Sequence, residues 1–327
     1  EILKYPDDSA GSIMTIEYVS LRPTMTVEEA IKRIRRTGVD KETIYTCYVT
    51  DTNRILLGTV SIKDLLLNEE NELIEDIMET NCVSVHTLED QEQVANQCNK
   101  YDLLAIPVVD EEERLVGIVT IDDVVDVMQD EATEDIKKMA AIIPLDKSYF
   151  SNTVFETWKS RIPWLLLLMI SSTFTGMIIT SFESALATQT ILTVFIPMIM
   201  GTGGNSGGQS SVTIIRALSL GEVGFKDTFR VIWKELRVAI LCGTTLAVCN
   251  FLKLMLFDRL EFMVALVISL TLLATVAIAK LIGCTLPILA KKVGFDPAVM
   301  ASPFITTIVD AISLMIYFGI AILLLNI

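Results

Sequence analysis

Residues 151–327 contain long apolar stretches, and these limit the folds open to the chain more than any other feature. The stretches cover residues 162–182, 191–216, 237–257, 262–290 and 299–325. About 20 predominantly apolar residues in a helix cross the roughly 30 Å hydrocarbon core of a membrane. Because lipid offers no hydrogen-bond partners, a segment that crosses must satisfy its own backbone. The sequence therefore predicts an all-α membrane domain of five transmembrane helices.

The charge is divided unequally between the two halves of the chain. Residues 1–150 carry 32 acidic and 14 basic residues, a net charge of −18, whereas residues 151–327 carry 9 and 12, a net charge of +3. An acidic surface of this size repels nucleic acid and attracts cations. We therefore expect a soluble first half, divalent cations and the lipid bilayer as partners, and no nucleic acid.

Basic residues alternate between the loops that join the apolar stretches. The segments before residue 162, between 221 and 237, and after 290 are basic, whereas the 183–190 loop has no cation and the 258–261 turn has only Arg259. Basic loops stay on the cytoplasmic side. This pattern predicts a multi-pass protein of the cell (plasma or inner) membrane, with its N-terminus cytoplasmic and its C-terminus outside.

The soluble half is an internal repeat. Residues 47–64 realign on residues 106–123 at a constant offset of 59, and residues 14–20 realign on 78–84 at an offset of 64. Each copy is predicted to form a helix, a strand, an Asp-containing turn, a second strand that ends in Gly-x-Val-[Ser/Thr]-Ile, and another helix. The pattern predicts an α/β module built from two copies.

This repeat resembles a tandem pair of cystathionine-β-synthase-type (CBS) domains over residues 11–130. Such pairs form regulatory pseudo-dimers and often bind adenine nucleotides or ions between the copies. The resemblance makes Asp64 and Asp123 candidates to hold the ribose of a nucleotide. Either residue could instead cap the helix that follows it, and the pair could be a dimerisation platform that binds nothing.

An acidic stripe follows the repeat, with Asp122, Asp126, Asp130 and Glu134 at four-residue steps. Like charges at this spacing lie side by side on a helix and cost about 0.2–0.5 kcal/mol per pair. A hard divalent cation such as Mg²⁺ or Ca²⁺ would compensate that cost, since it prefers oxygen ligands. The alternative is a solvated acidic face. The segment leads directly into the membrane half, which favours the cation.

Two features interrupt the apolar stretches. Residues 201–211 include five glycines together with Asn205 and Gln209, so this part of the second stretch either lines a polar cavity or packs closely against other helices. Asp310 lies about half-way along the last stretch, where a carboxylate is costly unless it is protonated, paired, hydrated or occupied by a cation. Lys280 is the candidate partner for an ion pair, although it could extend to the membrane surface instead.

Residues 203–209 (Gly-Gly-Asn-Ser-Gly-Gly-Gln) and 303–310 (Pro-Phe-Ile-Thr-Thr-Ile-Val-Asp) resemble the motifs of the MgtE family of magnesium channels, and the order of CBS pair, connecting helix and five spans is similar too. The resemblance implies a homodimer with a pore on the two-fold axis. It places Gly204, Asn205, Thr306 and Asp310 along the ion pathway and Asp296 at its cytoplasmic mouth. It also implies regulatory ligands for cytosolic Mg²⁺, with Mn²⁺ or Ca²⁺ as alternatives; these are Glu92, Asp102, Asp123, Asp126, Glu131, Glu134 and Asp135.

The resemblance divides the chain into a first CBS repeat (1–75), a second repeat (76–127), a connecting, plug-like helix (128–157) and a transmembrane pore domain (158–327). It implies a Mg²⁺-selective channel or transporter for magnesium uptake that cytosolic Mg²⁺ closes by binding to the CBS pair and connecting helix. Family members usually have an acidic helical domain before the CBS pair. Since the chain begins where that domain should end, we expect looser gating.

The sequence leaves two other classes of protein to consider, a membrane enzyme and a sensor that conducts no ion. A membrane metalloprotease needs His-Glu-x-x-His, and the single histidine, His86, lies in the soluble half, so no enzyme is expected. The remaining alternative is a non-conducting, membrane-anchored CBS sensor of divalent cations or nucleotide, with Asp310 as a buried structural acid.

Overall fold

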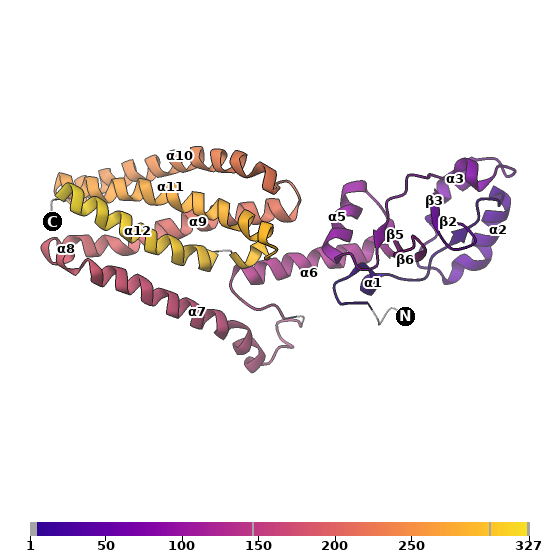
Figure 1. Cartoon of the computed structure of the whole chain (residues 1–327), viewed down its shortest axis with the longest axis horizontal. Coiled ribbons are helices and arrows are strands. Elements are labelled where there is room, and N and C mark those ends of the chain that lie inside the picture. The colour runs from indigo at the N-terminus through magenta and orange to yellow at the C-terminus, as the bar shows by residue number, and fades with distance from the viewer. Residues whose placement is uncertain (1–4, 146, 301, 326–327) are drawn as a thin grey trace. The chain divides into compact units, whose positions relative to one another are not determined.

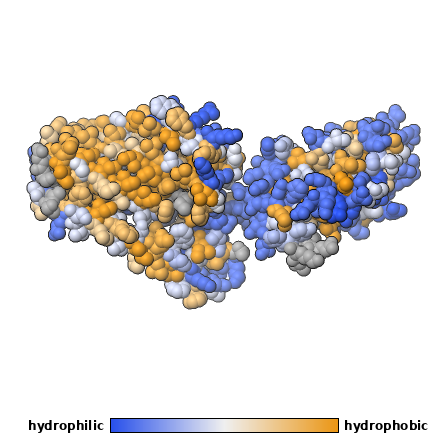
Figure 2. All heavy atoms as spheres, in the orientation of Figure 1, coloured by the Kyte–Doolittle hydropathy of each residue, from blue (hydrophilic) through white to orange (hydrophobic). Residues whose placement is uncertain are grey.

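The computed structural model describes residues 5–145, 147–300 and 302–325 and divides into two compact units, residues 1–133 and 134–327 (Figure 1). Figure 2 shows that hydrophilic residues dominate the visible surface of the first unit and hydrophobic residues that of the second. This contrast follows the charge difference between the two halves of the sequence.

The first unit alternates short helices and strands. Its elements are α1 (Ala10–Ile13), β1 (Ser20–Leu21), α2 (Val27–Thr37), a 3₁₀ turn (Gly38–Asp40), β2 (Thr46–Thr50), β3 (Leu56–Ser61), α3 (Ile62–Leu67), α4 (Ile74–Ile77), β4 (Val85–His86), α5 (Gln91–Tyr101), β5 (Ala105–Val109) and β6 (Leu115–Thr120). Helix α6 (Ile121–Met139) begins in this unit and continues into the second.

The strands form two sheets of the same topology, with orders β1-β2-β3 and β4-β5-β6. In each sheet the first pair of strands is parallel and the second is antiparallel. The registers repeat at the predicted offsets: Leu21 lies opposite Val49 in one sheet, and Val85 lies opposite Val108 in the other. The prediction of an internal α/β repeat is therefore confirmed residue by residue.

Each copy contributes its leading segment to the other copy. Thr15 pairs with Ile118 of β6, and the equivalent Glu79 of the second copy pairs with Thr59 of β3. Met14 accordingly packs into the hydrophobic core of the second copy, and Met78 packs into that of the first. Because each core includes residues of both copies, the two repeats form one folding module rather than two separable domains.

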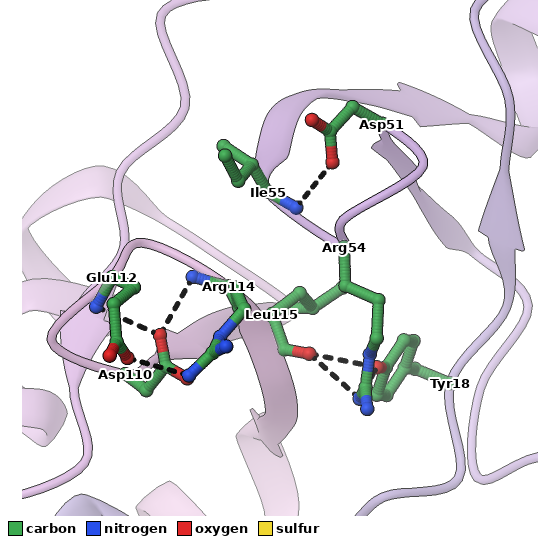
Figure 3. Close-up of polar contacts among 8 residues, drawn as sticks. All are labelled: Tyr18, Asp51, Arg54, Ile55, Asp110, Glu112, Arg114 and Leu115. Atoms are coloured by element: carbon green, nitrogen blue, oxygen red, sulfur yellow. Dashed lines mark hydrogen bonds and ion pairs between the residues drawn. The ribbon is translucent and has the colours of Figure 1, made fainter.

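The turns between the strands of each copy also match (Figure 3). The Asp51 carboxylate accepts a hydrogen bond from the Ile55 N–H at 2.8 Å, and Asp110 accepts one from the Arg114 N–H at 2.9 Å. Arg54 then links the copies, since its guanidinium donates to the Leu115 carbonyl at 2.9 Å. These are the Asp-containing turns that the repeat predicted.

The second unit is helical. Its elements are α7 (Val154–Ser181), α8 (Glu183–Thr188), a 3₁₀ segment (Thr190–Phe195), α9 (Ile196–Ser219), a 3₁₀ turn (Phe225–Asp227), α10 (Thr228–Leu256), α11 (Phe262–Val293), a 3₁₀ turn (Pro297–Met300) and α12 (Ser302–Leu325). Helix α11 is the most buried of the long apolar helices and packs against α9, α10 and α12.

Four helices in the described part of the chain are long and apolar enough to cross a membrane: residues 154–181, 225–256, 262–293 and 303–325. Helix α9 corresponds to the predicted second span, but its glycine, serine, asparagine and glutamine residues lower its hydropathy. The membrane-spanning character of this unit is thus clear, whereas the count of five includes a helix that is not apolar throughout. Helix α7 differs from the others, because only 6% of its most apolar 18-residue stretch is buried against the rest of the chain.

The connecting helix is shorter than predicted at its C-terminal end. It runs as α6 from Ile121 to Met139, and the described residues between 140 and 153 are not helical. Ala141 has a positive φ of 55°, a left-handed conformation that a helix does not continue through. The next helix begins at Val154, after a side-chain cap from Thr153.

Candidate functional site

The glycine-rich run is part of a continuous helix, α9, and its glycines allow close packing. A Cβ at Gly204 would lie 2.8 Å from Cγ2 of Thr306 on α12, and a Cβ at Gly283 on α11 would overlap the carbonyl oxygen of Gly207. Helices that meet through small residues approach at backbone distance. The close-packing interpretation of residues 201–211 therefore describes the face of α9 that contains these glycines.

The opposite face of α9 is polar and exposed. Asn205 and Gln209 are both exposed and lie one turn apart, whereas Gly203, Gly204 and Gly207 are buried. Close packing therefore describes one face of α9, and the interpretation that Asn205 and Gln209 line a polar cavity stays a prediction. Gly204 contacts Thr306, and Asn205 follows Gly204 on the same helix. Three of the residues predicted to line the ion pathway therefore lie close to one another in one chain.

Asp310 lies one turn beyond Thr306 on α12 and is half-buried. Residues four apart on a helix share a face. Within the described part of the chain, no hydrogen bond or ion pair involves the Asp310 carboxylate. A carboxylate inside a membrane span that lacks a protein partner needs water, a proton or a cation to offset its desolvation.

Lys280 does not pair with Asp310. Its ammonium is buried and lies 3.4 Å from the Ser210 hydroxyl, which donates to the Glu235 carboxylate at 2.6 Å. The lysine is therefore held inside the bundle beside α9 and α10, so neither alternative, the ion pair with Asp310 or the extension to the membrane surface, describes it. This polar cluster was not predicted, because nothing in the spacing of residues 210, 235 and 280 indicates that they meet.

Asp296, the residue predicted at the mouth of the pathway, contacts the connecting helix. Lys138 of α6 lies 2.6 Å from the Asp296 carboxylate and 2.7 Å from that of Glu134. Burial lowers the pKa of Lys138, but hydrogen bonds to Asp296 and Glu134 raise it by more, so its pKa lies above the ordinary range and the lysine stays charged. Lys138 was not among the predicted site residues, although its four-residue spacing from Glu134 indicates an ion pair on a helix.

The predicted regulatory ligands lie mostly on one helix. Glu92 is in the first turn of α5, Asp102 ends α5 with a φ of 52°, and the others lie on α6; these are Asp123, Asp126, Glu131, Glu134 and Asp135. Gln91 donates to the Glu131 carboxylate at 2.8 Å, which brings the start of α5 to α6. Among the described residues of one chain, no three carboxylate, histidine or cysteine side chains form a metal cluster.

Electrostatic repulsion acts on Asp123, which lies beside the acidic stripe on α6, whereas a hydrogen bond from Thr120 lowers the pKa of Asp122 in the stripe itself. Burial raises the pKa of the Asp123 carboxyl above its ordinary value, the Thr120 hydroxyl opposes that shift, and the charges of Asp122 and Asp126 reinforce it. A cation bound to one or two of these carboxylates through water would relieve the repulsion.

A cavity of about 460 Å³ lies between the two CBS copies, with Thr46, Ser61 and Asp64 of the first copy and Asp102 and Leu104 of the second in its wall. Asp64 also accepts a hydrogen bond from the Ser61 hydroxyl at 2.6 Å, so it caps α3 and faces the cavity at once. Asp123 accepts the equivalent bond from Thr120 at 3.0 Å but does not line this cavity. The two candidate nucleotide ligands thus share a side-chain hydrogen bond to the residue three positions earlier, but only Asp64 lines the cavity.

The fold and these sites together define a class of protein: an integral membrane transport protein with an unpaired carboxylate on an intramembrane helix and a tandem CBS module in its soluble part. A family model described as the MgtE divalent cation transporter matches residues 196–320, and a CBS domain model matches residues 10–70 and 74–130. The chain belongs to the MgtE family of magnesium transporters, as the following relatives show.

The curated relatives match nearly the whole chain. The magnesium transporter MgtE of Thermus thermophilus is 41% identical over 325 residues, which is 99% of this chain and 72% of that protein. The magnesium transporter MgtE of Enterococcus faecalis is 37% identical over 98% of this chain and 70% of its own length. The magnesium transporter MgtE of Bacillus subtilis is 38% identical over 98% of this chain and 70% of its own length.

Two of the solved structures to which the chain is similar come from magnesium transport proteins. The cytosolic domain of the Mg²⁺ channel MgtE in complex with ATP is 48% identical, with a TM-score of 0.38, over 38% of this chain and 51% of that chain. The soluble part of a magnesium transporter is 44% identical, with a TM-score of 0.40, over 40% of this chain and 51% of that chain. The chain therefore spans about half the length of each of these two structures.

Proposed function

We propose that the chain is a Mg²⁺-selective channel or transporter that mediates magnesium uptake across the cell membrane and is closed by cytosolic Mg²⁺. The observation that carries the proposal is the Asp310 carboxylate, which lies on the apolar helix α12 and has no hydrogen-bond or ion-pair partner among the described residues. The relatives of this chain that are named magnesium transporter MgtE support Mg²⁺ as the transported ion.

The arrangement suits a hydrated ion. Mg²⁺ releases its waters reluctantly and is commonly held by one or two carboxylates with several waters retained. In the proposed homodimer each chain would contribute one Asp310, and the two carboxylates would bind first-shell waters across the two-fold axis. The largely unburied α7 gives each chain apolar surface that a lipid or a second chain must cover.

Transport is tested with the purified protein in liposomes that contain a Mg²⁺ indicator. Influx well above that of empty vesicles supports the proposal. If influx equals that of empty vesicles while the protein is folded and inserted, the non-conducting sensor becomes the better description.

Lys138 tests how the connecting helix closes the pathway. We expect Lys138→Met to leave a flux about fivefold above wild type at millimolar Mg²⁺ on the cytoplasmic side, because a partly exposed ion pair to Asp296 contributes about 1 kcal/mol to the closed state. The measurement is liposome flux against internal Mg²⁺. Lys137→Met is the matched control, since its ammonium donates to the Leu145 carbonyl instead. Identical inhibition curves for Lys138→Met and wild type would remove the pair from gating.

The regulatory carboxylates of α6 are tested by proteolysis. We expect millimolar Mg²⁺ to protect the segment after α6 from protease, and Glu131→Ala plus Asp135→Ala to weaken that protection, because the variant loses two oxygen ligands on adjacent turns. Glu69→Ala plus Glu70→Ala removes the same charge from an exposed site elsewhere and should behave like wild type. Mn²⁺ and Ca²⁺ are tested in parallel as alternative ions. Cleavage rates independent of every cation would contradict the regulatory proposal.

The cavity between the CBS copies is proposed to bind an adenine nucleotide through Asp64. We expect Asp64→Asn to weaken ATP binding about tenfold, since a hydrogen bond to a charged group contributes about 1.5–3 kcal/mol. Calorimetric titration of the purified chain measures the effect. Asp123→Asn alters the equivalent hydrogen bond from the Thr120 hydroxyl but does not line the cavity, so it serves as the control for effects on the helix start alone. Equal losses in both variants would mean that Asp64 acts only as a cap.

A further inference from the structure

A second large cavity lies at one end of the membrane unit, between the last turns of α9 and the first turns of α10. Its volume is about 950 Å³, and four basic side chains line it: Arg216, Arg230, Lys234 and Arg237. None of the residues assigned above to the ion pathway or to the regulatory sites lines this cavity.

The four cations have no ion-pair partner among the described residues, whereas two of the three nearby carboxylates accept hydrogen bonds. No ion pair within the described residues involves Arg216, Arg230, Lys234 or Arg237. Of the three carboxylates in the wall, Asp227 accepts a hydrogen bond from the Gly224 N–H at 3.0 Å, and Glu235 accepts one from Ser210 at 2.6 Å. Glu222 is the third. The cavity therefore presents more available positive than negative charge.

The position of the cavity is interfacial. Its cations precede or open the apolar part of α10, which the sequence places at residues 237–257. Trp233 lines the cavity and is 55% exposed, and tryptophan is enriched at the level of lipid headgroups. Apolar side chains, including Val212, Leu220 and Val231, form the rest of the wall. A ligand here meets both basic groups and hydrocarbon.

We propose that this cavity binds the headgroup and the upper acyl chain of an anionic phospholipid. Basic pockets between transmembrane helices bind such headgroups, and each lysine or arginine near an anionic surface contributes about 1 kcal/mol. The apolar wall accounts for a lipid rather than free phosphate, which has no hydrocarbon to bury. The site is separate from the transport proposal, because lipid binding is measured without any flux.

Native mass spectrometry of the purified full chain in detergent tests the site with three probes: phosphatidylglycerol, phosphatidylcholine and inorganic phosphate. We expect phosphatidylglycerol to bind at least about tenfold more tightly than phosphatidylcholine, and Arg230→Gln plus Lys234→Gln to abolish that preference. Lys159→Gln plus Arg161→Gln removes two exposed cations near the start of α7, outside the cavity, and should retain it.

Three results would overturn the proposal. The first is an unchanged preference for phosphatidylglycerol in the Arg230 and Lys234 variant with an unchanged melting temperature. The second is displacement of the lipid by inorganic phosphate at comparable concentration, which would make this a simple anion site. The third is dissociation of the dimer in that variant without loss of bound lipid, which would make the cavity a contact between copies of the chain.

Discussion

Asp310→Ala is expected to reduce selective Mg²⁺ flux about 100-fold while leaving the protein folded and dimeric. The carboxylate is the one charge found on α12 in the described residues, and it has no protein partner there. Loss of about 3 kcal/mol of ion stabilisation at one point of a pathway corresponds to about two orders of magnitude in occupancy. Flux into liposomes and size-exclusion chromatography of the same preparation measure the two parts of the prediction.

Asp310→Asn sharpens this test, because it keeps the shape of the side chain and removes only the charge. We expect it to conduct as poorly as Asp310→Ala. Thr245→Ala is the control, since this hydroxyl lies on α10 and donates to the Leu241 carbonyl of its own helix. Wild-type flux in both Asp310 variants would exclude the carboxylate from the mechanism and would favour the non-conducting sensor.

Gly283→Ala is expected to cause the largest loss of stability of any single methyl group added to the membrane unit. The new Cβ would overlap the Gly207 carbonyl oxygen, which is backbone and cannot rotate away as a flexible side chain does. Overpacking of this kind costs about 1–3 kcal/mol, and more where the backbone must move. The melting temperature and the folded yield in detergent measure the effect.

Gly176→Ala is the matched control, because a Cβ at Gly176 meets nothing within 4 Å. In a helix, alanine is favoured over glycine by about 1 kcal/mol, so this variant should be at least as stable as wild type. Equal melting temperatures for the two variants would show that α9 and α11 are not in backbone contact in the folded protein.

The repeat and the two antiparallel strands of each copy could be predicted closely, because a turn joins them directly, whereas the parallel strands β1 and β4 were not predicted. Two copies with the same alternation and turn residues must form the same register, and both offsets reappear in the pairing of Leu21 with Val49 and of Val85 with Val108. The end of α6 was harder to predict, since the residues after Met139 carry no strong stop signal before Pro144.

Contacts between distant residues could not be predicted in the same way. The ion pair between Lys138 and Asp296 joins positions 158 residues apart, and only the packing of α6 near the start of α12 brings them together. The different access of Asp64 and Asp123 likewise depends on the shape of the cavity between the CBS copies rather than on the repeat, which treats the two positions as equivalent. The family motifs suggested candidate residues for the ion pathway, but not which face of α9 each would occupy.

The backbone contact between Gly207 and Gly283 limits how the membrane unit can change shape. Helices that touch without intervening side chains lose most of their dispersion energy if one slides or turns on the other. Helices α9 and α11 are therefore expected to move together as one rigid unit. In the proposed homodimer, the pore would therefore widen by a tilt of whole α9–α11 pairs against each other, and its width would depend on how the two pairs meet.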